Sequence, residues 1–329
     1  MLQTLGFLAG LALLAWCVRT AMSPENRESV RRLADADPRL VAAVLGLSAL
    51  SLAINGLAFF VAIRPVRTLP AIDVVATNCL VTFLNYLPFK IGAVTRFLVH
   101  NRRDGMPVLM IGAWIIAVAL ILVSCMLPLI GASLWRHGTD LAWFGASFAG
   151  LLVCVGAVVV GATLFAGERG HARLVVIAGT AGGRLGRNLV SSRFFRQLLA
   201  GLDMLADVRA TALAVLLRLS NVGVQTARFL VVAKMLHEPL TPGTALIAAS
   251  CYFLIGILSP AGMLGAREGG TAALLSIPGV TGGEGGAWFA AATLLVGAAE
   301  LVANSIAGLL SAAWLRPWKF LHGRSKVGA

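Results

Sequence analysis

Six charged residues stand inside stretches of the chain that are otherwise apolar. They are four arginines and two glutamates: Arg96, Arg218, Arg228, Arg267, Glu268 and Glu300. A guanidinium group matches phosphate through two parallel hydrogen bonds, and a fixed cation in apolar surroundings requires a counter-charge. Four cations against two anions leave two positive charges without a partner. These residue types therefore predict a binding site for an anion, in which the glutamates hold the arginines in place or accept a proton.

One helix face gathers polar side chains around two of these arginines. Arg218, Asn221, Gln225 and Arg228 follow the spacing i, i+3, i+7, i+10, which puts them on one side of a helix. An arginine near the middle of a bilayer costs at least about 2.5–3.5 kcal/mol, so two on one face indicate partners or a hydrated cavity, unless Arg228 reaches the outer interface. Shorter polar stripes lie at Ser48, Ser51 and Asn55, at Asn78, Thr82 and Asn85, and at Glu300 and Asn304. Such stripes also commonly link neighbouring helices, which is the interpretation favoured for residues 48–55.

Two segments combine proline, glycine and arginine, one in each half of the chain, at residues 85–96 and 260–268. Irregular backbone at membrane depth persists only where protein or a water-filled cavity satisfies it, and helix breaks in corresponding positions of two halves indicate a binding site. The alternative is that both segments are ordinary helix ends that resemble each other by chance. On the first interpretation, the substrate-binding residues are Asn85, Arg96, Arg218, Asn221, Gln225, Arg228, Arg267, Glu268 and Glu300, and the helix-break residues are Pro88, Gly92, Pro260, Gly262 and Gly265.

The composition indicates which solvent surrounds these residues. Of the 329 residues, 58% are hydrophobic and 12% are charged, against roughly 45–50% apolar and about 25% charged in soluble domains. The mean hydropathy is +0.87, and so few charges cannot cover the surface of a soluble fold. This excludes a soluble enzyme, a nucleic-acid-binding domain and a secreted disulfide scaffold, and the long apolar runs exclude an outer-membrane barrel. The five cysteines and five histidines are scattered without ligand spacing, so we expect no metal site, no cofactor and no catalytic residues.

The apolar segments predict an all-α polytopic membrane protein. A bilayer core about 30 Å thick takes roughly 20 apolar residues per helix. Seven segments qualify: 4–22, 40–63, 72–89, 107–131, 141–166, 210–235 and 288–313. The stretch 244–280 is apolar but broken at its centre, so it forms either two crossings or a re-entrant hairpin. Either form gives about eight membrane passages, including the Pro/Gly-broken segments.

The distribution of lysine and arginine predicts the orientation. The connections 23–39, 90–105 and 167–209 and the tail 314–329 hold nineteen of these residues, against four in the alternating connections. Basic residues concentrate in cytoplasmic loops. We therefore expect a protein of the inner (cytoplasmic) membrane with its N-terminus outside and its C-terminus in the cytoplasm. Basic loops at the anionic inner leaflet also account for the net charge of +13.

The chain is expected to form a single transmembrane domain, 1–329, with a cytoplasmic connection at 167–209. After Ser191 and Ser192, apolar residues recur at helical spacing as far as Leu205, with charged residues on the remaining faces. This pattern predicts an amphipathic helix that lies on the inner leaflet. The Gly-rich segment 179–186 ahead of it lacks the Gly-Lys-Ser/Thr ending of a phosphate-binding loop, so we expect a flexible linker there.

The two broken segments resemble the signatures of one membrane-protein family. The pattern Asn-x-x-Pro-x-x-x-Gly-x-x-x-Arg over residues 85–96 and the segment 260–269 around its Arg-Glu pair are similar to the two motifs of the lysylphosphatidylglycerol-synthase transmembrane (flippase-like) family. Met263 stands where the second motif of that family has glycine. The resemblance covers residues 5–315. It implies an inner-membrane protein of about eight passages with re-entrant segments, associated with handling lipids or moving them between leaflets.

Together these features favour a lipid translocator. An anionic phospholipid or a lipid-linked phosphate would place its phosphate against the arginines while its tails stay in the bilayer. One alternative is a non-catalytic membrane partner of a lipid-modifying enzyme, which it would contact through 167–209. Another is a transferase for a lipid-linked donor with Glu268 or Glu300 as general base, although the sequence has no Asp-rich metal pair or nucleophile–base constellation. No nucleic-acid partner is expected.

Overall fold

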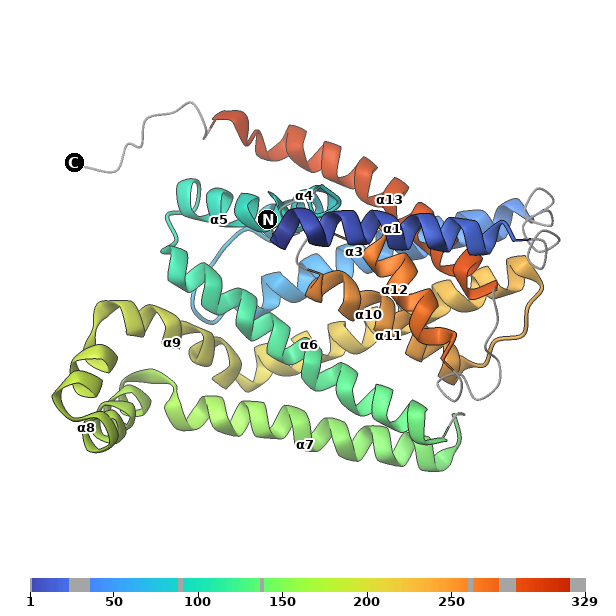
Figure 1. Ribbon diagram of the computed structural model, residues 1–329. Coiled ribbons are helices and arrows are strands. Elements are labelled where there is room, and N and C mark those ends of the chain that lie inside the picture. The colour runs from blue at the N-terminus through green and yellow to red at the C-terminus, as the bar shows by residue number, and fades with distance from the viewer. Residues whose placement is uncertain are drawn as a thin grey trace.

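The computed structural model describes residues 2–23, 36–87, 91–136, 139–259, 263–277 and 288–319. Within these ranges the regular elements are α-helices (Figure 1). In chain order they are α1 (Leu2–Ala21), α3 (Pro38–Ile63), α4 (Ala71–Leu84), α5 (Ile91–Arg102), α6 (Val108–Arg136), α7 (Leu141–Phe165), α8 (Gly167–Ser191), α9 (Arg193–Ala206), α10 (Val208–Leu236), α11 (Pro242–Leu258), α12 (Ala266–Leu275) and α13 (Trp288–Leu315). The predicted all-α polytopic architecture is confirmed.

The long helices run along a common direction (Figure 1). Five of them, α3, α6, α7, α10 and α13, have 25 to 29 residues and are apolar enough to cross a membrane. The helix α1, with 20 residues, also reaches the length that a bilayer core requires. These six helices correspond to the predicted spans 40–63, 107–131, 141–166, 210–235, 288–313 and 4–22.

Aspartate caps set where three of the crossing helices begin. Asp37, Asp140 and Asp207 are the N-caps of α3, α7 and α10, and each accepts a hydrogen bond from a backbone N–H in the first turn, at 2.8, 2.8 and 2.9 Å. Such a cap satisfies one backbone N–H that has no partner inside the helix and contributes about 1 kcal/mol. In a chain with few charged residues, these aspartates therefore mark the boundaries between successive apolar helices.

The segment predicted as the third crossing is instead a re-entrant hairpin formed by α4 and α5. Its two open ends lie together, because Arg67 donates to the backbone O of Asp104 at 2.8 Å and Arg103 pairs with Asp73 at 2.7 Å. The helix α4 has 14 residues, which at about 1.5 Å per residue is shorter than a bilayer core. The predicted crossing 72–89 and the predicted cytoplasmic connection 90–105 are therefore both wrong: the chain turns back after Leu84, and α5 returns to the side from which α4 entered.

The helices α11 and α12 form a second re-entrant hairpin, which decides the alternatives left open for 244–280. Tyr252 donates to Glu268 at 3.2 Å, and a Cβ atom on Gly256 would lie 2.7 Å from Cδ of Arg267. These contacts pair the two helices in antiparallel fashion. The helix α12 has only 10 residues and cannot cross a bilayer core. The described part of 244–280 is thus a hairpin and not two crossings.

The helix directions place the two described ends of the chain on one side of the molecule. Cys17, near the end of α1, donates to the backbone O of Ala290, near the start of α13, at 3.4 Å. The two helices therefore run antiparallel, and the start of α1 lies on the same side as the end of α13. This course of α1 and α13 differs from the prediction, which counted 72–89 as a crossing. The side of the membrane on which each chain end lies stays a prediction.

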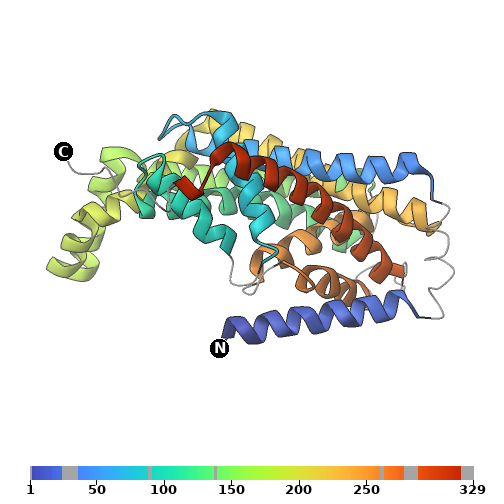
Figure 2. The same ribbon diagram turned by 90° about the horizontal axis from the view of Figure 1, so that it is seen from above.

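The two halves of the chain repeat one order of elements in opposite directions. A crossing helix, a hairpin and a second crossing helix follow one another in α3–α6 and again in α10–α13. The helices α3 and α10 are antiparallel, since Ser51 donates to Asn221 at 2.7 Å and Arg228 donates to Ser48 at 3.3 Å. The two hairpins consequently enter the molecule from opposite sides. The helix α1 lies along one edge beside α12, as Figure 2 shows from above.

The connection between α7 and α10 is helical throughout its described length. The expected linker 179–186 lies within α8, which bends at Gly183 (φ 58°, ψ −141°), so a flexible linker is not what forms there. The predicted amphipathic helix is α9, but its apolar residues Ala200, Met204 and Leu205 are buried in a core shared with α6. A Cβ atom on Gly201 would lie 3.0 Å from the backbone O of Ala113. This side of α9 therefore covers the bundle and not the leaflet.

Two apolar cores occupy opposite ends of the molecule along α10. One contains Phe229, Tyr252 and Phe289 and joins α1, α10, α11, α12 and α13. The other contains Trp114 and Met204 and joins the end of α3, the start of α6, α9 and the first half of α10. Between them, α3 and α10 turn their polar stripes towards each other, and this is where the candidate site lies.

Candidate functional site

The two hairpins meet at their tips in the middle of the molecule. The backbone N–H of Met263 donates to the backbone O of Asn85 at 3.1 Å, and Arg267 donates to the hydroxyl of Tyr86 at 3.0 Å. Gly92 permits the first hairpin to close, because a Cβ atom there would lie 2.2 Å from the backbone O of Val81. The residues that follow the end of α4 are thereby brought into direct contact with the residues around the start of α12.

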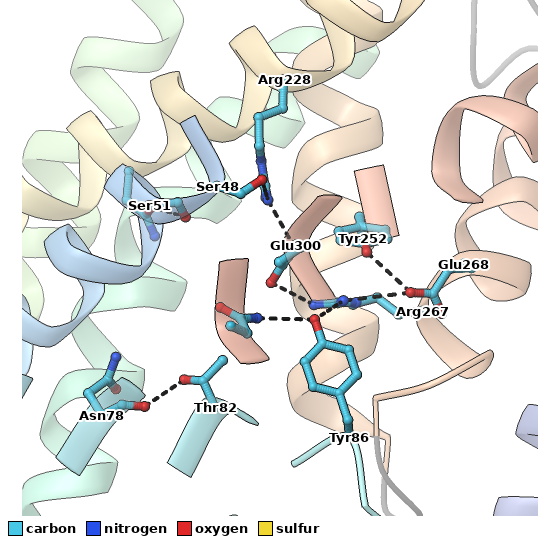
Figure 3. Close-up of polar contacts among 12 residues, drawn as sticks. Ser48, Ser51, Asn78, Thr82, Tyr86, Arg228, Tyr252, Arg267, Glu268 and Glu300 are labelled. Atoms are coloured by element: carbon cyan, nitrogen blue, oxygen red, sulfur yellow. Dashed lines mark hydrogen bonds and ion pairs between the residues drawn. The ribbon is translucent and has the colours of Figure 1, made fainter. Parts of the chain in front are cut away.

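Glu300 of α13 joins two arginines from different helices (Figure 3). One carboxylate oxygen accepts from Arg228 at 3.0 Å and the other accepts from Arg267 at 3.0 Å. Arg267 also lies 3.6 Å from Glu268. Two arginines and two glutamates therefore form one electrically neutral cluster. Buried charges persist where they are paired and hydrogen-bonded in this way.

Glu268 supports the second hairpin. Its side chain accepts from the backbone N–H of Gly265 at 2.7 Å, which caps the start of α12, and from the hydroxyl of Tyr252 at 3.2 Å. Gly265 itself has φ 79°, in the left-handed region where glycine is favoured, and a Cβ atom there would lie 2.1 Å from the backbone O of Gly10 in α1. A carboxylate with these partners holds the loop before α12 in place.

Arg96 and Arg218 are two further buried arginines, and their partners are not carboxylates. Arg96 donates to Asn78 at 2.9 Å, and its guanidinium carbon lies 3.8 Å from the centre of the Phe59 ring, in cation–π geometry. Arg218 donates to Asn55. The two arginines are 4% and 2% exposed. Among the described residues, neither has a carboxylate within 4.0 Å, so their partners are neutral amides and an aromatic ring.

A cavity of about 270 Å³ lies between these groups and reaches Arg96, Arg218, Arg267 and Glu300. Its polar wall comes from α3, the two hairpins, α10 and α13: Ser48, Ser51, Asn55, Asn78, Thr82, Asn85, Arg96, Arg218, Gln225, Arg267, Glu300 and Asn304. Its apolar wall comes mainly from α6 and α11: Ile115, Val118, Ala119, Leu122, Phe253, Gly256 and Ile257. The charged lining residues are three arginines and one glutamate, which gives the wall a net positive charge.

The structure brings most of the predicted site residues together. Asn85, Arg96, Arg218, Gln225, Arg267 and Glu300 line the cavity. The other three predicted binding residues do not line the cavity but contact residues at its wall. Asn221 accepts from Ser51, Arg228 donates to Glu300, and Glu268 caps α12. The residues 48–55 predicted to link helices do so through Ser51, and they also line the cavity. Pro88, Pro260 and Gly262 lie outside the described residues.

The two tyrosines are site residues that were not predicted from the sequence. The hydroxyl of Tyr86 accepts from both Arg267 at 3.0 Å and Asn304 at 3.1 Å, so it links the first hairpin to α12 and α13. Tyr252 lies under Arg267, whose guanidinium carbon is 4.2 Å from the ring centre. The chain has only two tyrosines, and each lies in a hairpin shortly before a Pro/Gly break. That coincidence is the signal that could have found them.

The fold and site define a class: polytopic helical membrane proteins in which two opposed re-entrant hairpins enclose a cationic cavity. The model of the lysylphosphatidylglycerol synthase TM region matches residues 4–308, so the chain belongs to that family, as the two motifs indicated. Comparison with curated proteins and with solved structures gives no match. The family membership supports a membrane protein connected with lipid metabolism or translocation.

Proposed function

We propose that this protein binds the phosphate of an anionic lipid in the central cavity and moves that headgroup between the two leaflets. The observation that carries the proposal is that Arg96 and Arg218 are buried at the same cavity without a carboxylate partner among the described residues. Their hydrogen-bond partners are neutral amides. Burying a cation without a counter-charge is expensive, because the low dielectric of the interior does not replace its hydration. A phosphate in the cavity supplies that counter-charge.

The apolar wall of the cavity fits the rest of a lipid. Ile115 and Ala119 of α6 and Phe253 and Ile257 of α11 line the same cavity as the arginines. Each is only partly buried in the molecule or exposed, so this wall continues towards the surface that surrounds the bundle. A lipid can therefore hold its phosphate against Arg96 and its hydrocarbon chains against α6 and α11.

The opposed hairpins supply the element that moves. Each hairpin carries polar backbone from one side of the membrane to the tip contact between Asn85 and Met263, and the cavity lies beside that contact. Broken helices that meet near the midplane are typical of transporters in which one repeat rocks against the other. Separation of the tips towards one side and then the other would expose the cavity to each leaflet in turn.

The side that carries α8 and α9 is assigned to the cytoplasm, in the inner membrane. Among the described residues, the segments 64–70, 101–107, 167–209 and 314–319 on this side hold thirteen lysines and arginines, against four near the helix ends on the other side: Arg19, Arg39, Arg136 and Lys234. Basic residues concentrate in cytoplasmic loops. In intact cells, a membrane-impermeant maleimide should label Thr139→Cys and leave Thr180→Cys unlabelled, and the opposite pattern would reverse the assignment.

Translocation is tested with the purified chain in proteoliposomes that contain a fluorescent phosphatidylglycerol. Dithionite should bleach more than half of the fluorophore, because lipid from the inner leaflet reaches the outer one, whereas empty vesicles stop at the outer half. Arg218→Gln should abolish this exchange. Arg136→Gln is the matched control, since Arg136 is an exposed arginine paired with Asp140. Exchange that equals that of empty vesicles, or that survives in Arg218→Gln, would contradict the proposal.

The alternative of a non-catalytic partner has its own observation. Val176 and Ile177 of α8 and Phe194 of α9 are 66%, 52% and 60% exposed, beside several arginines of the same connection. A partner that binds there should copurify with the wild-type chain and be lost from a Val176→Ser, Ile177→Ser variant. Copurification of a lipid-modifying enzyme without any lipid exchange would favour this alternative.

A further inference from the structure

The neutral polar residues of the cavity outnumber those that a phosphate group alone requires. Besides its charged residues, the wall contains five amides and three hydroxyls: Asn55, Asn78, Asn85, Gln225, Asn304, Ser48, Ser51 and Thr82. They extend from the Arg96–Arg218 pair to the neutral cluster around Glu300. A ligand whose phosphate lies against the two unpaired arginines therefore has further polar wall beside it. That wall is suited to a headgroup with hydrogen-bonding groups of its own.

Several of these amides have hydrogen-bonding capacity left over. The side-chain oxygens of Asn85 and Gln225 and the side-chain nitrogen of Asn78 are buried without a hydrogen-bond partner among the described residues. An amide presents a donor and an acceptor, and a hydroxyl group both donates and accepts. A hydroxyl can therefore pair with any of the three atoms, whereas an ammonium group can only donate and pairs with the two oxygens but not with the nitrogen of Asn78.

The charges of the wall disfavour a cationic headgroup. Glu300 is the one carboxylate among the described lining residues, and both of its oxygens already accept from arginines. Arg96 and Arg218 remain without a carboxylate partner. A lipid phosphodiester carries one negative charge, so it neutralises one of these two cations and the wall stays positive. An added ammonium group would meet that positive charge and find no free carboxylate.

From these observations we infer that the cavity selects a lipid whose phosphodiester carries a neutral, hydroxyl-bearing headgroup, and that it rejects the same lipid when the headgroup carries an amine. The inference rests on the proposed lipid-binding function and specifies its substrate. Two lipid types share the required chemistry, namely a glycerophospholipid with a polyol headgroup and a polyprenyl phosphate linked to a sugar. The lysyl ester of phosphatidylglycerol, the lipid after which the family is named, belongs to the rejected class.

The test compares binding of short-chain lipids to the full chain in phosphatidylcholine nanodiscs, measured by displacement of a fluorescent phosphatidylglycerol. The probes are dioctanoyl phosphatidylglycerol, its lysyl ester, phosphatidylethanolamine and phosphatidic acid, with a short polyprenyl phosphate sugar as the second hydroxyl-bearing arm. Phosphatidylglycerol, the polyprenyl phosphate sugar or both should bind about ten-fold or more tightly than the lysyl ester and phosphatidylethanolamine. The reason is that the ammonium groups of the last two lipids meet a positively charged wall with no free carboxylate. The arm that binds more tightly identifies the lipid type.

Variants separate the two parts of the site. Gln225→Leu and Asn85→Leu should weaken binding of phosphatidylglycerol about ten-fold and leave binding of phosphatidic acid unchanged, because phosphatidic acid has no headgroup hydroxyl to pair with these amides. Arg96→Gln should weaken both lipids. Losses of phosphatidylglycerol binding and phosphatidic acid binding that are equal in Gln225→Leu and Asn85→Leu, or binding of the lysyl ester as tight as that of phosphatidylglycerol, would overturn this inference and leave lipid binding intact. Failure of every anionic lipid to bind would instead overturn the proposed function.

Discussion

The two re-entrant hairpins have the same architecture, but the arginine of one is paired with carboxylates and the arginine of the other is not. Each follows a crossing helix, enters from one side and presents an arginine after a Pro/Gly break. Arg267 of the second hairpin is held by Glu300 and Glu268, whereas Arg96 of the first is held by Asn78 and the Phe59 ring. A repeated backbone thus supports one arginine that is paired with two carboxylates and one whose partners are neutral.

The position of each arginine along its helix accounts for this difference. Arg267 is the second residue of α12, so it lies at the tip, where Tyr86 and α13 come within reach. Arg96 is the sixth residue of α5, more than a turn further from the tip, where the neighbours are α3, α4 and α6. The described parts of those helices offer it no carboxylate. The hairpins therefore resemble each other in topology but not in the depth at which they present charge.

Glu300→Gln should produce the largest loss of stability and would break the comparison at the second hairpin. It leaves Arg228 without a carboxylate and Arg267 with only Glu268, and removal of one partner from a buried ion pair costs about 3–5 kcal/mol. Thermal unfolding of the purified chain in detergent measures the effect. The matched change Arg96→Gln removes a buried cation that has no carboxylate, so its free energy of unfolding should fall by no more than about 1 kcal/mol. Equal losses in the two variants would contradict the view that Arg267 depends on a carboxylate partner and Arg96 does not.

Gly92→Ala should have an intermediate effect and tests the packing of the first hairpin apart from its charge. The added Cβ atom would lie 2.2 Å from the backbone O of Val81, so α4 and α5 must separate at a cost of about 1–3 kcal/mol. The control is Gly46→Ala in α3, where nothing lies within 4 Å of the added atom. That control should gain about 0.5–1 kcal/mol from the better helix propensity of alanine. A loss in both variants would indicate a general intolerance of alanine and not a close approach of two helices.

Tyr86→Phe should have the smallest effect and sharpens the link between the hairpins. It removes the hydroxyl that accepts from Arg267 and Asn304, at an expected cost of about 1 kcal/mol. A double-mutant cycle with Asn304→Ala measures the coupling by chemical or thermal unfolding. Additive effects in that cycle would mean that the hydroxyl of Tyr86 does not join the first hairpin to α13.

The sequence predicted the contents of the site better than its topology. Helical spacing placed Arg218 and Gln225 on one face, and α10 carries them on one face at the cavity. Charge counting predicted two cations without carboxylate partners, and Arg96 and Arg218 are such a pair. These predictions succeed because they depend on local periodicity and on the cost of buried charge, which act on any helix in an apolar medium.

The hairpins could not be predicted from the sequence in the same way, because the contacts that close them join residues far apart in the chain. The segment 72–89 is apolar enough to be predicted as a crossing. What shows that it turns back is the pairing of the two ends of the hairpin, Arg67 with the backbone O of Asp104 and Arg103 with Asp73, which are about 30 residues or more apart in the sequence. One miscounted crossing also changes the number of crossings between the two chain ends, while the side on which the N-terminus lies stays a prediction. The same limitation applies to α9, whose apolar face is equally suited to a leaflet and to the helix α6 that covers it.

The tip-to-tip contact has an electrical consequence. Hairpins that bring polar backbone inwards from both sides leave the insulating layer thinnest at Asn85 and Met263. A transmembrane voltage would then fall mostly across this short stretch, and an anion that passes it would gain or lose about 2.3 kcal/mol per charge for each 100 mV. Lipid exchange recorded under an imposed potassium diffusion potential should accordingly run faster in one direction. Exchange that is indifferent to voltage would indicate that the headgroup crosses without net movement of charge.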